Sequence, residues 1–329
     1  MKLVTFIGHR GPTLGAVLGR EVLDLPTAAA LLGEKDFPNT MQALIESGDR
    51  GWARARALLE APPSEAFVQE MPRLLAPLPH PIRVRDCSMF LEHMEVALDK
   101  MALALAESDP DPPSALAKLR DSGRYTLHPV FREQIIYYNA DHLHIVGPDC
   151  DIAWPPHSTW ADYELEWACV LGRKGMDIQP DRARDHIFGF TIFNDWSARD
   201  LQIPFMQANL GPGEGKDFCN AFGPCIATLD EFTDPYRLRM TATVNGERWS
   251  TGSTASMYHH YEEAIVQFSH GKPLFAGEVI ASGTVLGGCG FELGRRLKHG
   301  DVVELEVEGI GSLRNRVLMS DSHPAPHSR

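Results

Sequence analysis

The sequence contains the stretch Asp162-Tyr163-Glu164-Leu165-Glu166-Trp167-Ala168-Cys169-Val170, whose apolar and aromatic residues predict a β-strand. Successive side chains of a strand point to opposite faces, so Glu164 and Glu166 share one face. At a rise of ~3.3 Å per residue their Cα atoms lie about 7 Å apart, and the two carboxylates repel each other unless a cation lies between them. Hard divalent cations such as Mg²⁺ prefer such oxygen ligands. The pair therefore indicates either a metal site or a solvated strand edge without function.

A second apolar stretch carries another carboxylate to the end of a strand. Residues 187–193, IFGFTIF, are almost all apolar and predict a buried strand. The chain continues into Asn194-Asp195-Trp196-Ser197-Ala198-Arg199-Asp200, where a helical pattern follows the acid. Asp195 is thus placed to supply a third oxygen ligand. Arg199, one helical turn further, can face the same cavity.

A glycine-rich stretch offers a basic group. It reads Gly211-Pro212-Gly213-Glu214-Gly215-Lys216-Asp217. It is not a P-loop, because the GxxxxGK[ST] pattern needs Ser or Thr after the lysine, where Asp217 stands. A flexible loop that ends in a lysine suits an anionic oxygen, and the alternative is a surface turn with a solvated Lys216.

The composition is that of an acidic globular protein. The chain has 329 residues, of which 43% are hydrophobic and 23% charged, ordinary values for a folded protein. Its 31 Lys+Arg against 44 Asp+Glu give a net charge of −13, which argues against sequence-independent binding to nucleic acid. No apolar run reaches the ~18–20 residues that span a bilayer, and residues 1–6 lack the features of a signal peptide. We therefore expect a cytoplasmic enzyme with neither a nucleic-acid nor a membrane partner.

The six cysteines are scattered along the chain without a CxxC pair. In a cytoplasmic protein such cysteines are expected to be reduced thiols packed as small apolar residues. Structural zinc sites use closely spaced cysteine pairs, so we expect no zinc site built from these cysteines.

Two regions of different texture divide the chain. Residues 1–80 combine short strand patterns with helical ones and end in a proline-rich stretch that predicts a linker. Later, a helical pattern covers residues 90–107, and from residue 135 onward strand patterns dominate. The dense glycine runs do not open a helix after a strand, which excludes a Rossmann fold. We predict an α+β protein with a small N-terminal domain, residues 1–80, and a catalytic domain, residues 81–329.

Several of these motifs together resemble the fumarylacetoacetate hydrolase family, in order and spacing, over roughly residues 85–318. The resemblance rests on Tyr163–Glu166, His186–Phe190, Asn194–Gln202, Gly211-Pro212, Gly215-Lys216 and Ala281–Thr284. It implies a mixed β-roll catalytic domain that usually dimerises, preceded here by a small α+β N-terminal domain. It also implies that Glu164, Glu166 and Asp195 hold Mg²⁺, with Mn²⁺ or Ca²⁺ as alternatives.

The same resemblance implies roles for residues around the metal. Arg199, Gln202 and Lys216 match positions that hold carboxylate, carbonyl or enolate oxygens of the substrate. Thr284 matches a position that binds the carboxylate end of the substrate, and Tyr138 one that contacts the substrate in some members. His93 is the counterpart of a catalytic histidine, and Glu292 matches an acid that partners this histidine in longer members.

One departure from the family pattern concerns the number of metal ligands. Fumarylacetoacetases proper have an additional metal-binding aspartate near the start of the catalytic domain. Here Met89 stands about where that acid would be, and a thioether is a poor ligand for Mg²⁺. We therefore expect the three-carboxylate site of the acylpyruvase-like members.

The resemblance implies a Mg²⁺-dependent hydrolase that cleaves a C–C bond in a small anionic β-diketo acid, an acylpyruvate-, fumarylpyruvate- or fumarylacetoacetate-like compound of aromatic catabolism. His93 would take a proton from the attacking water, and Lys216 would stabilise the departing enolate. The same site also suits decarboxylation of a 2-oxo acid such as oxaloacetate, enol–keto isomerisation, or dehydration. A catalytically silent binding protein is the alternative of another class. A homodimer is the expected assembly.

Overall fold

The strand predicted around Glu164 lies at the centre of a large sheet. In the computed structural model, which describes residues 1–9, 11–68, 70–107 and 109–320, β9 (Leu165–Leu171) pairs antiparallel with β10 (Ile187–Asp195). Both strands are buried along their whole length, as expected for strands covered on both faces. The register sets Glu166 opposite Phe193, so the beginning of β9 lies beside the end of β10.

Other strands extend this sheet on both sides. They are β1 (Lys2–Gly8), β2 (Gly11–Leu18), β3 (Glu21–Asp24), β4 (Arg83–Cys87), β5 (Tyr137–Ala140), β6 (Ile145–Val146), β12 (Asn220–Thr228) and β15 (Glu278–Ala281). Their order is β3-β2-β1-β12-β10-β9-β15-β4-β5, and β6 pairs with β12. The sheet is mixed, because β4 is parallel to β15 while β15 is antiparallel to β9.

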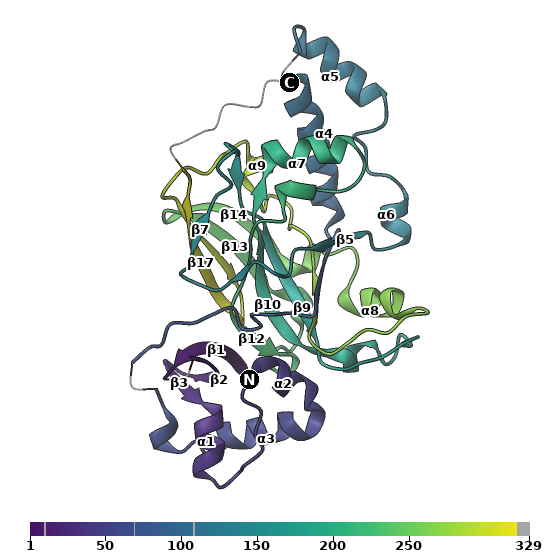
Figure 1. Ribbon diagram of the computed structural model, residues 1–329. Coiled ribbons are helices and arrows are strands. Elements are labelled where there is room, and N and C mark those ends of the chain that lie inside the picture. The colour runs from purple at the N-terminus through teal and green to yellow at the C-terminus, as the bar shows by residue number, and fades with distance from the viewer. Residues whose placement is uncertain (10, 69, 108, 321–329) are drawn as a thin grey trace.

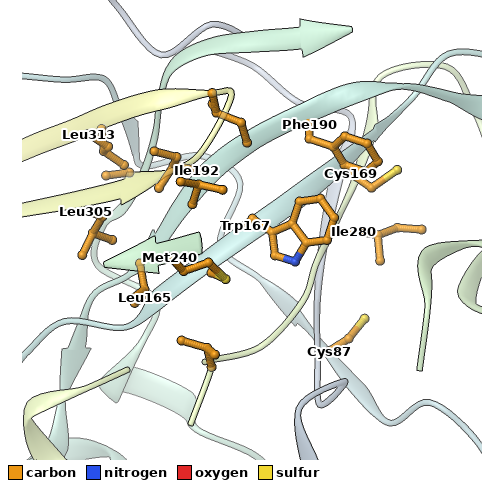
Figure 2. Packing of buried hydrophobic residues seen from close by; sticks show 14 of the residues in the cluster. Cys87, Leu165, Trp167, Cys169, Phe190, Ile192, Met240, Ile280, Leu305 and Leu313 are labelled. Atoms are coloured by element: carbon orange, nitrogen blue, oxygen red, sulfur yellow. The ribbon is translucent and has the colours of Figure 1, made fainter. Parts of the chain in front are cut away.

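A second sheet packs against the first. Its strands are β7 (Asp151–Ala153), β13 (Arg239–Val244), β14 (Glu247–Ser253), β16 (Val302–Val307) and β17 (Gly311–Leu318), in the order β14-β13-β16-β17-β7. Figure 2 shows Trp167 and Phe190 of the first sheet in one apolar cluster with Met240, Leu305 and Leu313 of the second. The Trp167 ring is fully buried, with its centroid 4.7 Å from that of Phe190. The α+β class predicted from the sequence is confirmed.

Helices cover the ends and edges of these sheets (Figure 1). They are α1 (Leu25–Leu31), α2 (Met41–Glu46), α3 (Gly48–Glu60), α4 (Leu91–Ala106), α5 (Pro112–Asp121), α6 (Val130–Glu133), α7 (Arg199–Gln207), α8 (Tyr261–Ser269) and α9 (Gly290–Leu293). Two short strands, β8 (Ala161–Asp162) and β11 (Ser197–Ala198), pair with each other, and β11 leads directly into α7. Within the ranges given above, no helix combines the length and apolar character needed to cross a membrane.

The N-terminal 80 residues share the large sheet with the rest of the chain. Strand β1 pairs antiparallel with β12, so that Lys2 lies opposite Ala227. Figure 1 shows β1, β2 and β3 together with α1, α2 and α3 at one end of the molecule, and α4 and α5 at the other. The sheet is therefore continuous across residue 80, and a boundary between two domains there stays a prediction.

One face of the large sheet positions the candidate site. An apolar cluster on that face contains Val84 of β4, Ala168 of β9, Phe193 of β10 and Ala281 of β15. Neighbouring residues on one face of a strand are two positions apart. Following each strand along this face leads from these apolar residues to acidic ones.

Candidate active site

Carboxylates end the apolar face on the strands β4, β9 and β10. Asp86, Glu166 and Asp195 each lie two residues from an apolar member of the cluster just described, so they share its face. Glu164, two residues before Glu166, continues the row, and its N–H donates to Asn194 Oδ1 at 3.0 Å. The structure thus brings together Glu164, Glu166 and Asp195, the three predicted metal ligands.

The cluster contains four carboxylates rather than the three expected. One oxygen each from Asp86, Glu164, Glu166 and Asp195 lies within 4.8 Å of the others, and all four residues are buried. The family resemblance placed Met89 about where the additional acid would be and predicted three carboxylates. In the structure the fourth carboxylate comes from Asp86 instead. Asp86 enters the cluster because it alternates with Val84 along β4, whereas Met89 lies beyond the strand as a buried apolar residue.

Lys216 provides a cation inside this cluster. Its Nζ forms ion pairs with Glu164 Oε2 and Asp195 Oδ2, and the residue is only 4% exposed. The loop that carries Lys216 packs closely against α7, because a Cβ at Gly215 would lie 2.5 Å from the Gln202 Cβ. This contact explains the glycine and excludes a solvated surface turn for Lys216.

Arg199 provides the second cation. At the start of α7, its Nη2 lies 2.8 Å from Glu164 Oε1, and its Nη1 donates to Gln202 Oε1 at 2.9 Å. The guanidinium is buried, as is Gln202. The predicted approach of Arg199 to the carboxylates therefore appears in the structure, and Glu164 contacts both buried cations.

The surroundings divide the carboxylates into two kinds. Burial, and then repulsion from Asp195, raises the pKa of Asp86 well above its usual range, and burial with repulsion from Asp86 does the same for Glu166. Burial also raises the pKa of Asp195, against the attraction of Lys216. By contrast, Lys216 and Arg199 overcome burial at Glu164 and hold the pKa of that carboxyl below its usual range. When all four carboxyls are ionised, their negative charges outnumber the positive charges of Lys216 and Arg199.

The cluster fits a hard divalent cation. Asp86 Oδ1 and Asp195 Oδ1 are buried and accept no hydrogen bond from the described residues, although buried polar atoms almost always have partners. All the donor atoms are carboxylate oxygens, the ligands that Mg²⁺, Mn²⁺ and Ca²⁺ prefer. A cation among them would satisfy the two oxygens and offset the repulsion that raises the pKa values.

A cavity of about 150 Å³ opens onto this cluster. The predicted residues that line it are His93, Tyr138, Glu164, Glu166, Arg199, Gln202, Lys216 and Thr284. Tyr138 donates from its hydroxyl to Asp195 Oδ2 at 2.6 Å, and Thr284 Oγ1 lies 3.4 Å from Glu166 Oε1. The other wall is apolar and comes mainly from α4 and α7, with Met94, Met101 and Met206 among its residues.

His93 and Glu292 meet at the edge of this cavity. His93 Nδ1 lies 3.0 Å from Glu292 Oε2, and both residues are buried. The two groups are in close polar contact, although the geometry is not that of a hydrogen bond. Glu292 is further held by the Gly287 N–H, which donates to its Oε1 at 3.1 Å. The acid predicted to partner His93 is therefore in contact with it.

Known proteins of one family are similar to this chain. Residues 117–318 match the fumarylacetoacetate (FAA) hydrolase C-terminal family. The chain belongs to the fumarylacetoacetate hydrolase family. It is 30% identical to oxaloacetate tautomerase YisK of Bacillus subtilis, over 96% of this chain and 100% of that protein. It is 36% identical to human mitochondrial oxaloacetate tautomerase FAHD2A, over 58% of this chain and 60% of that protein.

Solved structures share the fold. Fumarylacetoacetate hydrolase from psychrophilic Exiguobacterium antarcticum superimposes with a TM-score of 0.71 and 27% identity, over 97% of this chain and 100% of that one. Members of the fumarylacetoacetate hydrolase family that resemble this chain thus carry names of different reactions, tautomerisation and hydrolysis. The family is an enzyme family.

Asp162 is a residue of this candidate site that was not predicted from the sequence. Its Oδ1 accepts from the Gly290 N–H at 2.7 Å, and its Oδ2 accepts from the Phe291 N–H at 3.0 Å and from the guanidinium of Arg199. A signal was present, because Asp162, Glu164 and Glu166 alternate as D-x-E-x-E and a strand would place them on one face. Asp162 joins the helix that carries Glu292 to the arginine in the cavity.

Proposed function

We propose that the protein catalyses metal-dependent enol–keto tautomerisation of a small 2-oxo dicarboxylic acid of the oxaloacetate type. The observation that carries this proposal is the 30% identity, over the whole length, to a protein named oxaloacetate tautomerase. The cavity supports it, because it places two cations and an acid–base pair around a cluster suited to a divalent metal. Tautomerisation needs only proton transfer, without an attacking water.

Asp86, Glu164, Glu166 and Asp195 would hold the metal, with Mg²⁺ as the first choice and Mn²⁺ or Ca²⁺ as alternatives. When bound, such a cation supplies Lewis-acid polarisation of carbonyl and carboxylate oxygens. All four ligands come from one sheet face and the residue beside it. The ligand set is therefore rigid before any substrate binds.

The cations of the chain would bind and orient the substrate. Arg199 presents a planar guanidinium, which suits a carboxylate, and Gln202 fixes its orientation through Nη1. Lys216 Nζ would neutralise negative charge on the enolate oxygen, since it lies inside the low-dielectric cavity. Thr284 and Tyr138 would add hydroxyl contacts from the facing side.

His93 would carry the proton. Its Nδ1 faces Glu292, so Nε2 is the ring nitrogen left to exchange a proton with a molecule in the cavity. In the keto-to-enol direction, Nε2 would take a proton from the carbon beside the carbonyl, and the enol oxygen would gain one from Lys216 or water. Glu292 stabilises the imidazolium that forms in between.

The test measures how fast the enol form of oxaloacetate disappears, by its near-ultraviolet absorbance, in the presence of the Mg²⁺-loaded protein. We expect His93→Gln to lower the tautomerisation rate by at least ~100-fold, the usual range for a lost acid–base group. Glu164→Gln should lower it as well, because it removes a predicted metal ligand. Glu92→Gln is the matched control, because Glu92 is exposed beside His93 and should leave the rate unchanged. Wild-type protein that binds Mg²⁺ but does not speed enol decay contradicts the proposal.

Hydrolysis is the second candidate, and the buried His93–Glu292 pair favours it, because the pair could equally activate a water. The same preparations are therefore incubated with acetylpyruvate and fumarylpyruvate. Pyruvate released with a carboxylic acid would identify a C–C hydrolase, and pyruvate with CO₂ from oxaloacetate would identify a decarboxylase. We also propose a homodimer, which light scattering after size exclusion tests directly.

A further inference from the structure

His93, Cys289 and Glu292 form a second cluster of metal-ligating side chains beside the carboxylates. One ligand atom of each lies within 4.8 Å of the others, and all three residues are buried. Cys289 precedes α9 and Glu292 lies within it, three residues on, so one helical turn brings both side chains to the same side. A β-bridge between Cys289 and Glu164 holds the cluster next to the metal-binding carboxylates.

The two separations to Glu292 Oε2 are close to those of a tetrahedral zinc site. Bond lengths of ~2.3 Å to sulfur and ~2.0 Å to nitrogen and oxygen, at tetrahedral angles, set sulfur and oxygen about 3.5 Å apart and nitrogen and oxygen about 3.3 Å apart. Cys289 Sγ lies 3.5 Å from Glu292 Oε2, and His93 Nδ1 lies 3.0 Å from the same oxygen. Both separations differ from the tetrahedral values by no more than a few tenths of an ångström, and the ligand atoms of Cys289 and His93 lie within 4.8 Å of each other.

A second observation points to a ligand at this place. His93 is 8% exposed, and its Nδ1 is buried without a hydrogen bond to any residue in the described part of the chain. Buried polar atoms of this kind normally have a partner. This nitrogen lies 3.0 Å from Glu292 Oε2 without the geometry of a hydrogen bond, and His93 also lines the cavity, which provides a path for an ion.

We infer that His93, Cys289 and Glu292 bind a borderline-soft divalent cation of the zinc type, at a site separate from the four carboxylates. Sulfur and imidazole ligands favour Zn²⁺ over Mg²⁺, whereas the all-oxygen cluster favours hard cations. On binding, the Cys289 thiol loses its proton to the buffer and a metal–sulfur bond forms, with no change of oxidation state. Thiolate and carboxylate together balance the charge of the ion, and the fourth position is left for water.

Occupation of this site would take His93 out of proton transfer. Zn²⁺ should therefore inhibit the Mg²⁺-loaded enzyme, a consequence that rests on the proposed function. The binding itself does not rest on that function, so it is tested without activity. The cysteine spacing in the sequence excluded a site of cysteine pairs, and this site uses one cysteine that the fold brings to a histidine and an acid.

The experiment titrates Co²⁺ into the full-length protein in saturating Mg²⁺ and records the near-ultraviolet thiolate-to-cobalt charge-transfer band. Zn²⁺ affinity is then measured by competition with a chromophoric chelator. Cys289→Ser is the test variant. Cys87→Ser is the matched control, because Cys87 is a buried cysteine that lines the same cavity beside Asp86. Circular dichroism melting establishes that both variants fold.

We expect the band in the wild type and in Cys87→Ser, its loss in Cys289→Ser, and a fall in Zn²⁺ affinity of at least ~10-fold in Cys289→Ser. His93→Gln should also weaken Zn²⁺ binding. The inference is overturned if the wild type shows no thiolate band, or if Cys87→Ser rather than Cys289→Ser abolishes it. If Cys289→Ser does not fold, retention of full Zn²⁺ affinity in His93→Gln overturns it instead. A protein inactive on oxaloacetate that still shows the Cys289-dependent band would contradict the proposed function alone.

Discussion

Asp162 accepts two hydrogen bonds from the guanidinium of Arg199, with Oδ2 at 2.9 Å from Nε and 2.7 Å from Nη2. Both side chains are buried, at 0% and 5% exposure. The pair therefore anchors the arginine of the cavity from behind, while Nη2 also reaches Glu164. A buried arginine held in this way cannot reorient freely, which is what a fixed carboxylate-binding group needs.

This anchoring predicts a large loss of stability in Asp162→Asn. Removing the charge leaves the buried guanidinium of Arg199 short of a partner, so the free energy of unfolding should fall by ~3–5 kcal/mol. Urea denaturation measures this change in the free energy of unfolding. The control is Asp151→Asn, which removes a two-bond pair with Arg316 at the surface and should change the free energy of unfolding little, because exposed ion pairs stabilise a fold only weakly. Equal losses in the two variants would contradict the anchoring role.

The fourth carboxylate predicts that Asp86→Asn weakens Mg²⁺ binding. A site of three carboxylates would leave the affinity unchanged, whereas a site that includes Asp86 should lose at least ~10-fold. Isothermal titration calorimetry measures the dissociation constant. Glu92→Gln removes an equal charge from an exposed position on α4 and serves as the control. An unchanged affinity in Asp86→Asn would restore the three-carboxylate site.

The sequence predicted those parts of the site that depend on local alternation and missed those that depend on pairing between distant strands. Glu164 and Glu166 lie on one strand, so their common face could be read directly. Asp86 joins them only because β4 reaches β9 through β15, a pairing of residues far apart in the chain. Glu292 and His93 were matched through family resemblance, and no local pattern shows that they touch.

The same difference between local patterns and long-range strand pairing applies to the fold. The buried strand predicted over residues 187–193 follows from a nearly continuous apolar run, and the helix near residues 90–107 follows from helical periodicity. Both are present in the structure. Strand β12 was not expected, because Gly223 and Pro224 interrupt its pattern. That strand carries the pairing with β1, so the continuity of the sheet across residue 80 could not be seen from the sequence.

The raised pKa values of Asp86 and Glu166 predict a pH effect in the metal-free protein. These buried groups keep their protons where the unfolded chain has lost them, so the folded state binds more protons. Their contribution to stability is complete below about pH 4, the ordinary pKa range of carboxyls, and is lost as the pH rises through the raised pKa values.

In excess EDTA we therefore expect the free energy of unfolding to fall between pH 5 and pH 8, by up to about 1.4 kcal/mol per pH unit for each titrating group. Glu166→Gln removes one such group and should show a shallower fall. Denaturation curves at matched ionic strength measure both. The prediction is contradicted if the free energy of unfolding of the wild type stays constant or rises over this pH range. It is also contradicted if that free energy falls equally steeply with pH in both proteins.

Gly283 predicts the most local effect on the site. Its φ is +77°, and a Cβ there would lie 2.1 Å from the backbone oxygen of Cys87. Its N–H donates to Glu166 Oε2 at 2.9 Å, so the strain of a side chain would be passed to a predicted metal ligand. Gly283→Ala should lose ~1–2 kcal/mol to the left-handed backbone and a further ~1–3 kcal/mol to the clash.

Gly287→Ala separates the cost of the left-handed backbone from the cost of the steric clash. Gly287 has a similar φ of +68°, but an added Cβ meets no atom of the described residues within 4 Å. It should therefore lose only the backbone term and keep its Mg²⁺ affinity, whereas Gly283→Ala should lose both stability and affinity. Urea denaturation and calorimetry on the same preparations compare them. If the two variants behave alike, the contact between Gly283 and Cys87 does not hold Glu166 in place, and the rigidity of the ligand set must come from the strands alone.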